Sequence, residues 1–540
     1  MRREEYTRRV VRSSLWAAAG DAVGWITELA KSERSVSHRT GGRAVDRPVD
    51  WKRKIGGRSG VSVDLPAGTY SDDTQLRLAV CRAMRGDGVF DVEAFAKVEL
   101  TAWQGYHLGA GVGTLAAASH LARTNVNWFS NTFVSKKRIY ASAGGNGAAM
   151  RVQPHVWVSG GDTDMIMRSA FRDAIVTHGH PHGFCGAIFH ALCLRDAIDM
   201  GGVPPIGHAH SYVDRLSDLP RLAREDSELS SFWIGNWEAN SNAEIEEAVY
   251  QFQSEASADI EDLIGLDKGG PEATYHAALD MLGCLTPAYR GSGFKTALAA
   301  LVLANLFPKT PEDALLVAAH ELQSDTDTIA TMAGAILGAV AESEPRWAIQ
   351  DRDYIETEAL RLANIASGDP VRSFSYPDLA TWRPPANHSD AVGAFEGGLA
   401  LRGLGRLAPI GREYASSSAI WQWCELGFGQ TVLVKRRKGA LEDIDGSQLP
   451  GHDRPRPKFP PKRDTKVAGA QDQGLLPLLD TPGFSSIDEA TQAIIRSNFD
   501  NETIGRLLNA CIEETESVES AIAMSAIIAK AKIARRKGKA

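Results

Sequence analysis

The chain has 540 residues, of which 43% are hydrophobic and 23% are charged, and its formal net charge is −8 at pH 7. A chain of this length and composition can bury one large core with smaller units beside it, as globular proteins do. The acidic net charge gives no electrostatic reason to expect nucleic-acid binding, although local basic runs occur near the C-terminus. Six cysteines without a CxxC pair favour reduced thiols in a cytoplasmic protein.

The first residues resemble a signal peptide in part, because 1–12 are basic and 13–20 are small and apolar. Asp21 interrupts this apolar run before it is long enough for a signal peptide. No stretch approaches the roughly 18 uninterrupted apolar residues of a membrane span. We therefore expect a cytoplasmic protein without membrane spans.

Roughly the first 365 residues are predicted to be mainly helical, because apolar residues recur there with helical spacing. The Ala-rich segments with this spacing are 73–84, 92–103, 168–177, 187–197, 295–306 and 311–320. Gly-rich joints separate them, and strand-like alternation is rare. The pattern predicts an all-α bundle whose loops carry the polar chemistry.

The composition changes after residue 367. Aromatic and β-branched residues at 420–426 and 431–434 predict short strands, so residues 368–437 would form a small appended unit of mixed structure. Residues 438–475 are rich in proline and charge, which is typical of a linker. Residues 476–540 would be a helical tail, with helices at 487–496 and 504–535. Residues 1–367 would then form the main domain.

Two acidic clusters precede predicted helices. The first is SDDT at 71–74, and the second is SDTDT at 324–328, before a small-residue helix at 329–340. Helix capping explains one such side chain per helix, and adjacent carboxylates repel one another unless a cation neutralises them. Hard oxygen ligands suit Mg²⁺ or Mn²⁺ rather than zinc. For each cluster alone, capping and metal binding both stay open.

Five motifs occur in a fixed order along the chain. They are GDAVGWITE at 20–28, SDDT at 71–74, GNGAAMR at 145–151, THGHP at 177–181 and SDTDTIATMAG at 324–334. On these motifs the sequence, from about residue 6 to about residue 364, resembles the ADP-ribosylglycohydrolase family, which includes the dinitrogenase-reductase-activating glycohydrolases. The resemblance implies an orthogonal all-helical bundle, with residues 1–367 as its catalytic domain.

The resemblance also implies a pair of Mg²⁺ ions, with Mn²⁺ as a substitute, at the bottom of a cleft. The implied ligands are Ser71, Asp72 and Asp73 from one side and Asp325, Asp327 and Thr328 from the other. The usual family form has two glycines just ahead of the aspartate that Asp325 matches, where this chain has Gln323 and Ser324. That difference leaves every implied ligand in place.

The first candidate for the catalytic carboxylate is Glu28, which ends the first motif, and the second candidate is Asp73 or Asp327. The alternative for Glu28 is a solvent-facing glutamate, and Gly20, Asp21 and Gly24 are expected to shape and pack the first helix. The implied substrate contacts come from two Gly-rich loops and one histidine: Gly109, Gly145, Asn146, Gly147 and His178. The loops would expose backbone N–H groups to phosphate or ribose oxygens. His178, His180 and His182 together could instead form a zinc-binding tract.

The implied activity is hydrolysis of the bond between ADP-ribose and an acceptor, which is a protein side chain or a similar group. The partner would be an ADP-ribosylated protein or another ADP-ribosylated molecule, and the acceptor itself is left open. One alternative is a non-catalytic ADP-ribose-binding or immunity-type protein. Another is a Mg²⁺-dependent nucleotide phosphohydrolase, which would release AMP or phosphate instead of ADP-ribose.

Overall fold

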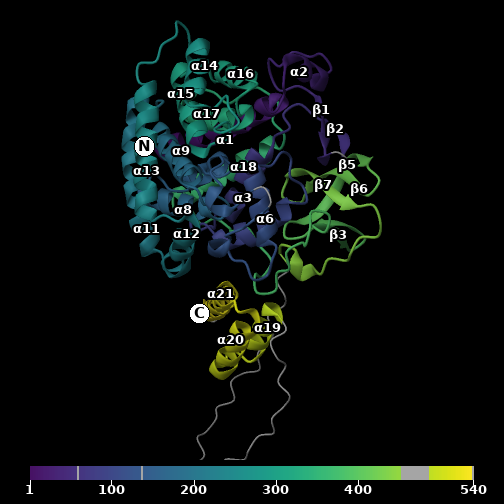
Figure 1. Ribbon diagram of the computed structural model, residues 1–540. Helices are drawn as coiled ribbons and strands as arrows, with labels where there is room; N and C mark the ends of the chain where they lie inside the picture. The colour runs from purple at the N-terminus through teal and green to yellow at the C-terminus, as the bar shows by residue number, and fades with distance from the viewer. Residues whose placement is uncertain (58–59, 136–137, 452–485, 538–540) are drawn as a thin grey trace, which may run out of the picture.

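The computed structural model describes residues 1–57, 60–135, 138–451 and 486–537. Helices fill the body of the molecule, a small sheet lies at one side, and three further helices follow near the C-terminus (Figure 1). The helices of the body are α1 (Arg3–Thr27), α2 (Glu33–Thr40), α3 (Asp72–Ala83), α4 (Val92–Ala94), α5 (Leu100–Trp103), α6 (Val112–Leu121), α7 (Gln153–Trp157), α8 (Thr163–Ile175), α9 (Pro181–Met200), α10 (Ala209–Arg215), α11 (Leu219–Glu225), α12 (Ile234–Ser241), α13 (Ile245–Leu263), α14 (Pro271–Met281), α15 (Gly293–Leu306), α16 (Pro311–His320), α17 (Thr326–Val340) and α18 (Arg352–Ala366). The prediction of a mainly helical bundle with a small mixed C-terminal extension is confirmed.

Two antiparallel sheets accompany the helices. A two-stranded hairpin consists of β1 (Trp51–Ile55) and β2 (Val61–Leu65). A five-stranded sheet, here called the extension sheet, has the order β3-β4-β5-β6-β7. Its strands are β3 (Val392–Phe395), β4 (Gly398–Leu401), β5 (Gly405–Ala415), β6 (Ala419–Leu426) and β7 (Thr431–Arg437). The strands predicted at 420–426 and 431–434 are thus confirmed, whereas the hairpin was missed.

Most of the predicted helices occur at their predicted places. Residues 73–84, 168–177, 187–197, 295–306, 311–320 and 329–340 lie in or at the ends of α3, α8, α9, α15, α16 and α17. The segment 92–103 is helical but not uniform, since a π-helical turn, Phe95–Glu99, joins α4 to α5. The bundle that the spacing predicted is therefore present, with local changes in helix type.

Helices α1 and α17 run antiparallel and cross in close backbone contact. Two glycines on each helix allow it, namely Gly20 and Gly24 on α1 and Gly334 and Gly338 on α17. A Cβ atom at any of the four would lie 2.3–2.5 Å from a backbone oxygen of the facing helix. Side chains there would push the helices apart, so the glycines let the backbones touch. The antiparallel crossing brings the C-terminal end of α1 to the N-terminal end of α17.

The extension sheet shares its hydrophobic core with the bundle. Buried residues of β6 and β7, among them Trp421 and Val432, belong to the same cluster as the helices. A buried polar network also joins the two parts. Arg82 of α3 forms an ion pair with Glu99 at 2.8 Å and donates to Gln430 Oε1, also at 2.8 Å. The helical bundle and the extension sheet are consecutive in the chain, but they therefore share one hydrophobic core.

The C-terminal helices are α19 (Ile487–Arg496), α20 (Asn501–Thr515) and α21 (Val518–Lys537). The predicted helix at 504–535 is broken at Glu516, whose backbone is left-handed with φ of 47°. The three helices have a small core of their own, and Lys530 of α21 pairs with Glu93 at 2.6 Å on the bundle. The predicted linker, 438–475, is described only to Gly451, and its remainder lies outside the described residues. The domain boundaries at 367, 437 and 475 remain predictions.

None of the helices in the described ranges has the length and apolar character needed to cross a membrane.

Candidate active site

The two predicted acidic clusters lie at helix starts that face each other. Ser71 is the N-cap of α3, and its hydroxyl accepts a hydrogen bond from the backbone N–H of Asp73 at 3.2 Å. Asp325 is the N-cap residue of α17, but its side chain caps nothing. Thr328 Oγ1 donates to Asp73 Oδ1 at 3.3 Å, which joins the clusters across about 250 residues of sequence. Capping therefore accounts for Ser71 and leaves the carboxylates for another role.

Glu28 completes this group from the end of α1. Carboxylate oxygens of Glu28, Asp325 and Asp327 all lie within 4.8 Å of one another. Within the described parts of the chain, no other set of three or more carboxylate, thiol or imidazole side chains is so close. Glu28 is next to the site because the α1–α17 crossing brings the two helix ends together. The solvent-facing alternative for Glu28 does not hold, since its side chain is 18% exposed.

Burial and mutual repulsion disfavour the charged forms of these carboxylates. Burial raises the pKa of Asp72, Asp73 and Asp327 well above the usual value, and neighbouring carboxylates raise it further. Burial also raises the pKa of Glu28, with Asp325 adding to the effect and Arg53 opposing it. A group of acids in this state gains most from a bound cation, because a cation removes the repulsion.

The residues present fit a divalent cation. Asp73 Oδ2 is buried and has no hydrogen-bond partner in the described structure, which is an unusual state for a carboxylate oxygen. The surrounding donors are carboxylates and hydroxyls, the hard ligands that Mg²⁺ and Mn²⁺ prefer. The acidic triad of Glu28, Asp325 and Asp327 could thus hold a metal ion beside Asp73.

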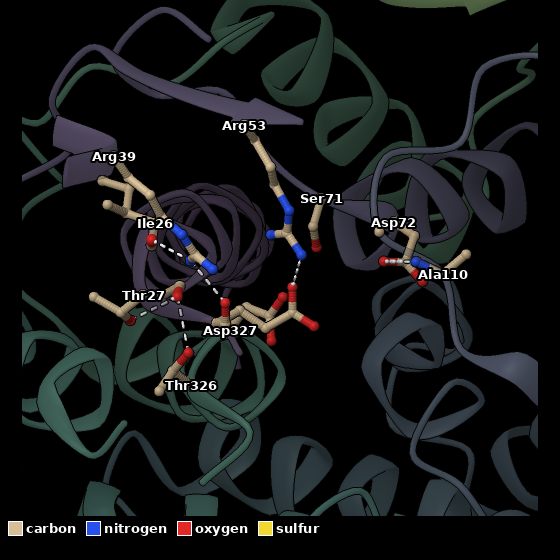
Figure 2. Close-up of polar contacts among 12 residues, drawn as sticks. Ile26, Thr27, Arg39, Arg53, Ser71, Asp72, Ala110, Thr326 and Asp327 are labelled. Carbon is tan, nitrogen blue, oxygen red and sulfur yellow. Dashed lines mark hydrogen bonds and ion pairs between the residues drawn. The ribbon is translucent and has the colours of Figure 1, made fainter. Parts of the chain in front are cut away.

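Asp21 and the first Gly-rich loop hold α3 in place. Both oxygens of the buried Asp21 accept backbone N–H groups, from Ser71 and from Thr74, each at 2.9 Å. Asp21 is thus structural, as expected from the sequence. On the other side, the N–H of Ala110 donates to Asp72 Oδ1 at 3.0 Å (Figure 2). Gly109 has φ of 90°, and a Cβ there would lie 2.3 Å from Asp72 Oδ1. The predicted contact residue Gly109 therefore lies directly against a predicted ligand.

The loop of Gly145, Asn146 and Gly147 also reaches the acidic group. Asn146 Nδ2 donates to Asp325 Oδ2 at 3.0 Å. His178 lies beneath this loop and is 2% exposed, with Nδ1 2.7 Å from the hydroxyl of Thr177. Burial lowers the pKa of His178 to about 3, so the ring is neutral. The structure brings the loop to the site, whereas His178 supports the loop from behind.

The three histidines do not form a metal-binding tract. His182 turns away from His178, with Nδ1 2.8 Å from Ser292 Oγ and Nε2 3.1 Å from Glu255 Oε2. No group of His178, His180 and His182 meets the spacing of metal ligands among the described residues. The zinc alternative therefore has no support in the geometry.

Sequence reasoning missed Arg53, which comes from the β1–β2 hairpin. Its guanidinium forms an ion pair with Glu28 at 2.9 Å and lies over the ring of Trp25, 5.2 Å from the centroid. Figure 2 shows Arg53 pointing toward the carboxylates beside Asp327. The available signal was the alternation of apolar and polar residues at 61–65, which is typical of a strand, whereas 51–55 carries three consecutive charged residues between Trp51 and Ile55.

Fold and site together define a mainly α protein with a buried carboxylate centre suited to a divalent metal. The family model for ADP-ribosylglycohydrolase matches residues 2–370, and the chain belongs to this family. Membership supports glycosidase-type hydrolysis that reverses ADP-ribosylation, with ADP-ribosylated substrates. Among solved structures, one described as "ADP-ribosylglycohydrolase-related protein complex" is 20% identical with a TM-score of 0.40, and the match covers 67% of this chain and 99% of that one.

Proposed function

We propose that this protein is a Mg²⁺-dependent hydrolase that cleaves the glycosidic bond between ADP-ribose and an acceptor, a protein side chain or a similar group, and releases ADP-ribose. The observation that carries the proposal is the group of Glu28, Asp325 and Asp327, whose carboxylate oxygens lie within 4.8 Å of one another, together with the buried Asp73 oxygen that has no hydrogen-bond partner in the described structure. A cation would neutralise the repulsion within this group, which its few hydrogen bonds and the Arg53 ion pair offset only in part.

In this proposal two Mg²⁺ ions, or Mn²⁺ in their place, are held by the two helix starts. The ligands are Ser71, Asp72, Asp73, Asp325, Asp327 and Thr328. When bound, divalent ions in such a site hold substrate oxygens and stabilise developing negative charge. Their binding also explains how buried carboxylates remain ionised at neutral pH.

Glu28 is the proposed general base, with Asp73 as the second catalytic carboxylate. The bond at the anomeric carbon of the ribose breaks through an oxocarbenium-like state, and water adds to that carbon. Water adds its hydroxyl to that carbon and gives its proton to Glu28, and Glu28 passes this proton to the acceptor atom released by the bond cleavage. Arg53 supports this role because its ion pair favours the ionised, proton-accepting form of Glu28.

The proposed substrate contacts are the two loops at the rim of the acidic group and the histidine behind one of them. Gly109 has no side chain to cover Asp72, so a substrate can approach the backbone there. Asn146 has an amide oriented by Asp325, and Gly145, Gly147 and His178 complete the set. We place the chemistry in residues 1–367, with residues 368–437 as an appended unit, 438–475 as a linker and 476–540 as a helical tail.

The compartment we propose is the cytoplasm. All six cysteines are buried and unpaired, which is the usual state in a reducing compartment.

A release assay on a panel of ADP-ribosylated proteins, small molecules and nucleic acids tests the proposal. We expect free ADP-ribose as the product, only when Mg²⁺ or Mn²⁺ is present. AMP or phosphate as the product would identify a phosphohydrolase instead, and tight ADP-ribose binding without turnover would identify a binding protein. The panel also determines the acceptor.

A further inference from the structure

The ion pair between Arg53 and Glu28 depends on the position of the β1–β2 hairpin. The two side chains are 16% and 18% exposed and form an ion pair at 2.9 Å. Trp51, on the same strand, packs its ring on Trp25 of α1, with centroids 5.0 Å apart. A two-stranded ribbon is only marginally stable by itself, so its place over the site depends on what packs on its other side.

The extension sheet packs on that other side, and Figure 1 shows the hairpin next to β5 and β6. Tyr414 of β5 bonds to Asp64 of β2 twice: its hydroxyl lies 3.1 Å from Oδ2 and accepts the backbone N–H at 3.3 Å. Trp423 of β6 donates its indole N–H to the backbone oxygen of Asp64 at 3.3 Å. Asp64 pairs with Lys52, one residue from Arg53, so these contacts act close to the ion pair.

Two other contacts join the hairpin to the extension sheet. One positions the hairpin turn, and the other contributes little to stability. A Cβ at Gly56, in the turn, would lie 2.6 Å from the ring of Trp421, so the turn touches β6. Arg412 also pairs with Asp64, but its side chain is 68% exposed, and exposed ion pairs contribute little. The bonds from Tyr414 and Trp423 to the backbone of Asp64 are therefore the contacts to test.

The same sheet touches two more segments that lead to the site. The N–H of Lys435 on β7 donates to the oxygen of Gly105 at 2.8 Å, four residues before Gly109. The N–H of Thr431 donates to Asp351 Oδ2 at 2.8 Å, and Tyr70, directly before Ser71, donates to the same oxygen at 2.6 Å. All of these strands lie beyond residue 370, where the match to the family ends.

We propose that the extension sheet is a positioning element of the active site, which holds the β1–β2 hairpin so that Arg53 places the carboxylate of Glu28. Tyr414 and Trp423 are positioning residues, because they touch neither substrate nor the acidic group. The catalytic consequence rests on the proposed role of Glu28, whereas the contact between sheet and hairpin does not. The sheet is thus part of the hydrolase and not a separate module.

The test is the double variant Tyr414→Phe/Trp423→Phe in the full-length chain, which keeps an aromatic ring at each position and removes the bonds to Asp64. We expect faster hydrogen exchange at the amides of residues 51–55 and 61–65. We also expect kcat to fall about tenfold, with KM changed less than about twofold, because a misplaced base slows chemistry more than binding. The matched control, Tyr250→Phe/Trp382→Phe, changes an exposed tyrosine and an indole that bonds to Lys97, and should alter neither quantity.

A double-mutant cycle with Arg53→Ala distinguishes an effect transmitted through Arg53 from a general loss of stability. If the sheet acts through Arg53, the double variant should cause no further loss of kcat in the Arg53→Ala background. A full additional loss there, or unchanged exchange at the hairpin, would overturn the inference. Failure of the proposed function looks different: the wild type would then release AMP or phosphate, or bind ADP-ribose without turnover, while the exchange measurement would still report whether the sheet holds the hairpin.

Discussion

Asp327→Asn should make the metal-free protein more stable, although it removes a proposed ligand. Asp327 is 4% exposed, and its carboxylate lies within 4.8 Å of those of Glu28 and Asp325. Two unit charges at that distance repel by about 3.5 kcal/mol at an effective dielectric constant of about 20. Protonation and Arg53 relieve part of this repulsion, so we expect a gain of about 1–2 kcal/mol. The amide oxygen can still accept the N–H of Thr328, so no hydrogen bond is lost.

The pH dependence has a defined sign. Burial and the neighbouring carboxylates raise the pKa of Asp327 in the folded state above its unfolded value. The folded protein then holds this proton more tightly, so metal-free stability falls as the pH rises from about 4 through the raised pKa. Asp327→Asn lacks the titrating group and should show a shallower fall. The assay is thermal unfolding in chelator at a series of pH values upward from about 4, the pKa of an aspartate in the unfolded chain.

Added Mg²⁺ should reverse the order of the two proteins. Metal at about a hundred times its dissociation constant should stabilise the wild type by about 2.7 kcal/mol and the variant far less. The matched control is Asp173→Asn, a buried aspartate paired with Arg151 at 2.9 Å, which should lose about 3–5 kcal/mol with or without metal. A variant that is less stable in chelator, and equally stabilised by Mg²⁺, would refute the idea of a repulsive cation site.

Three further predictions concern activity and packing. Glu28→Gln should lower turnover by at least about 10²-fold with little change in Mg²⁺ affinity, measured by steady-state kinetics and calorimetry, and unchanged turnover would contradict its role as base. Removal of divalent cations by chelation should abolish release of ADP-ribose, and re-addition of Mg²⁺ should restore it; full activity in chelator would show that no metal is needed. Gly24→Ala should cost about 1–3 kcal/mol in a denaturant titration, because its Cβ would lie 2.3 Å from the backbone oxygen of Thr326, whereas Gly235→Ala, with open space around it, should be neutral or stabilising.

Local chemistry made the acidic group predictable. Asp72 and Asp73 are adjacent at a helix start, and Asp325 and Asp327 are two residues apart at another. The repulsion within each pair can therefore be inferred from the sequence alone. Glu28 was predictable only through its motif, because its environment depends on how α1 crosses α17. The small residues Gly20 and Gly24 were expected to pack the first helix, and they do.

The missing part of the site depends on contacts between distant segments. Arg53 reaches Glu28 across 25 residues, and Tyr414 reaches Asp64 across 350. Nothing local distinguishes Arg53 from the charged residues on either side of it. Arg53 matters because the alternation of side chains along β1 turns it toward Trp25 of α1. The pairing of β1 with β2 fixes that orientation.

The site and the stability of the fold compete at the same residues. Buried carboxylates at two facing helix starts destabilise the metal-free protein, so the surrounding structure must hold α1 and α17 together against that repulsion. The glycines at the crossing help to hold the two helices together, because their backbones pack directly against each other with no side chains between them. Arg53 also helps, because its positive guanidinium, paired with Glu28, offsets part of the negative charge of the acidic group before any metal binds. On this reasoning the extension sheet, by holding Arg53, contributes to the stability of the metal-free site as well as to the chemistry of the loaded one.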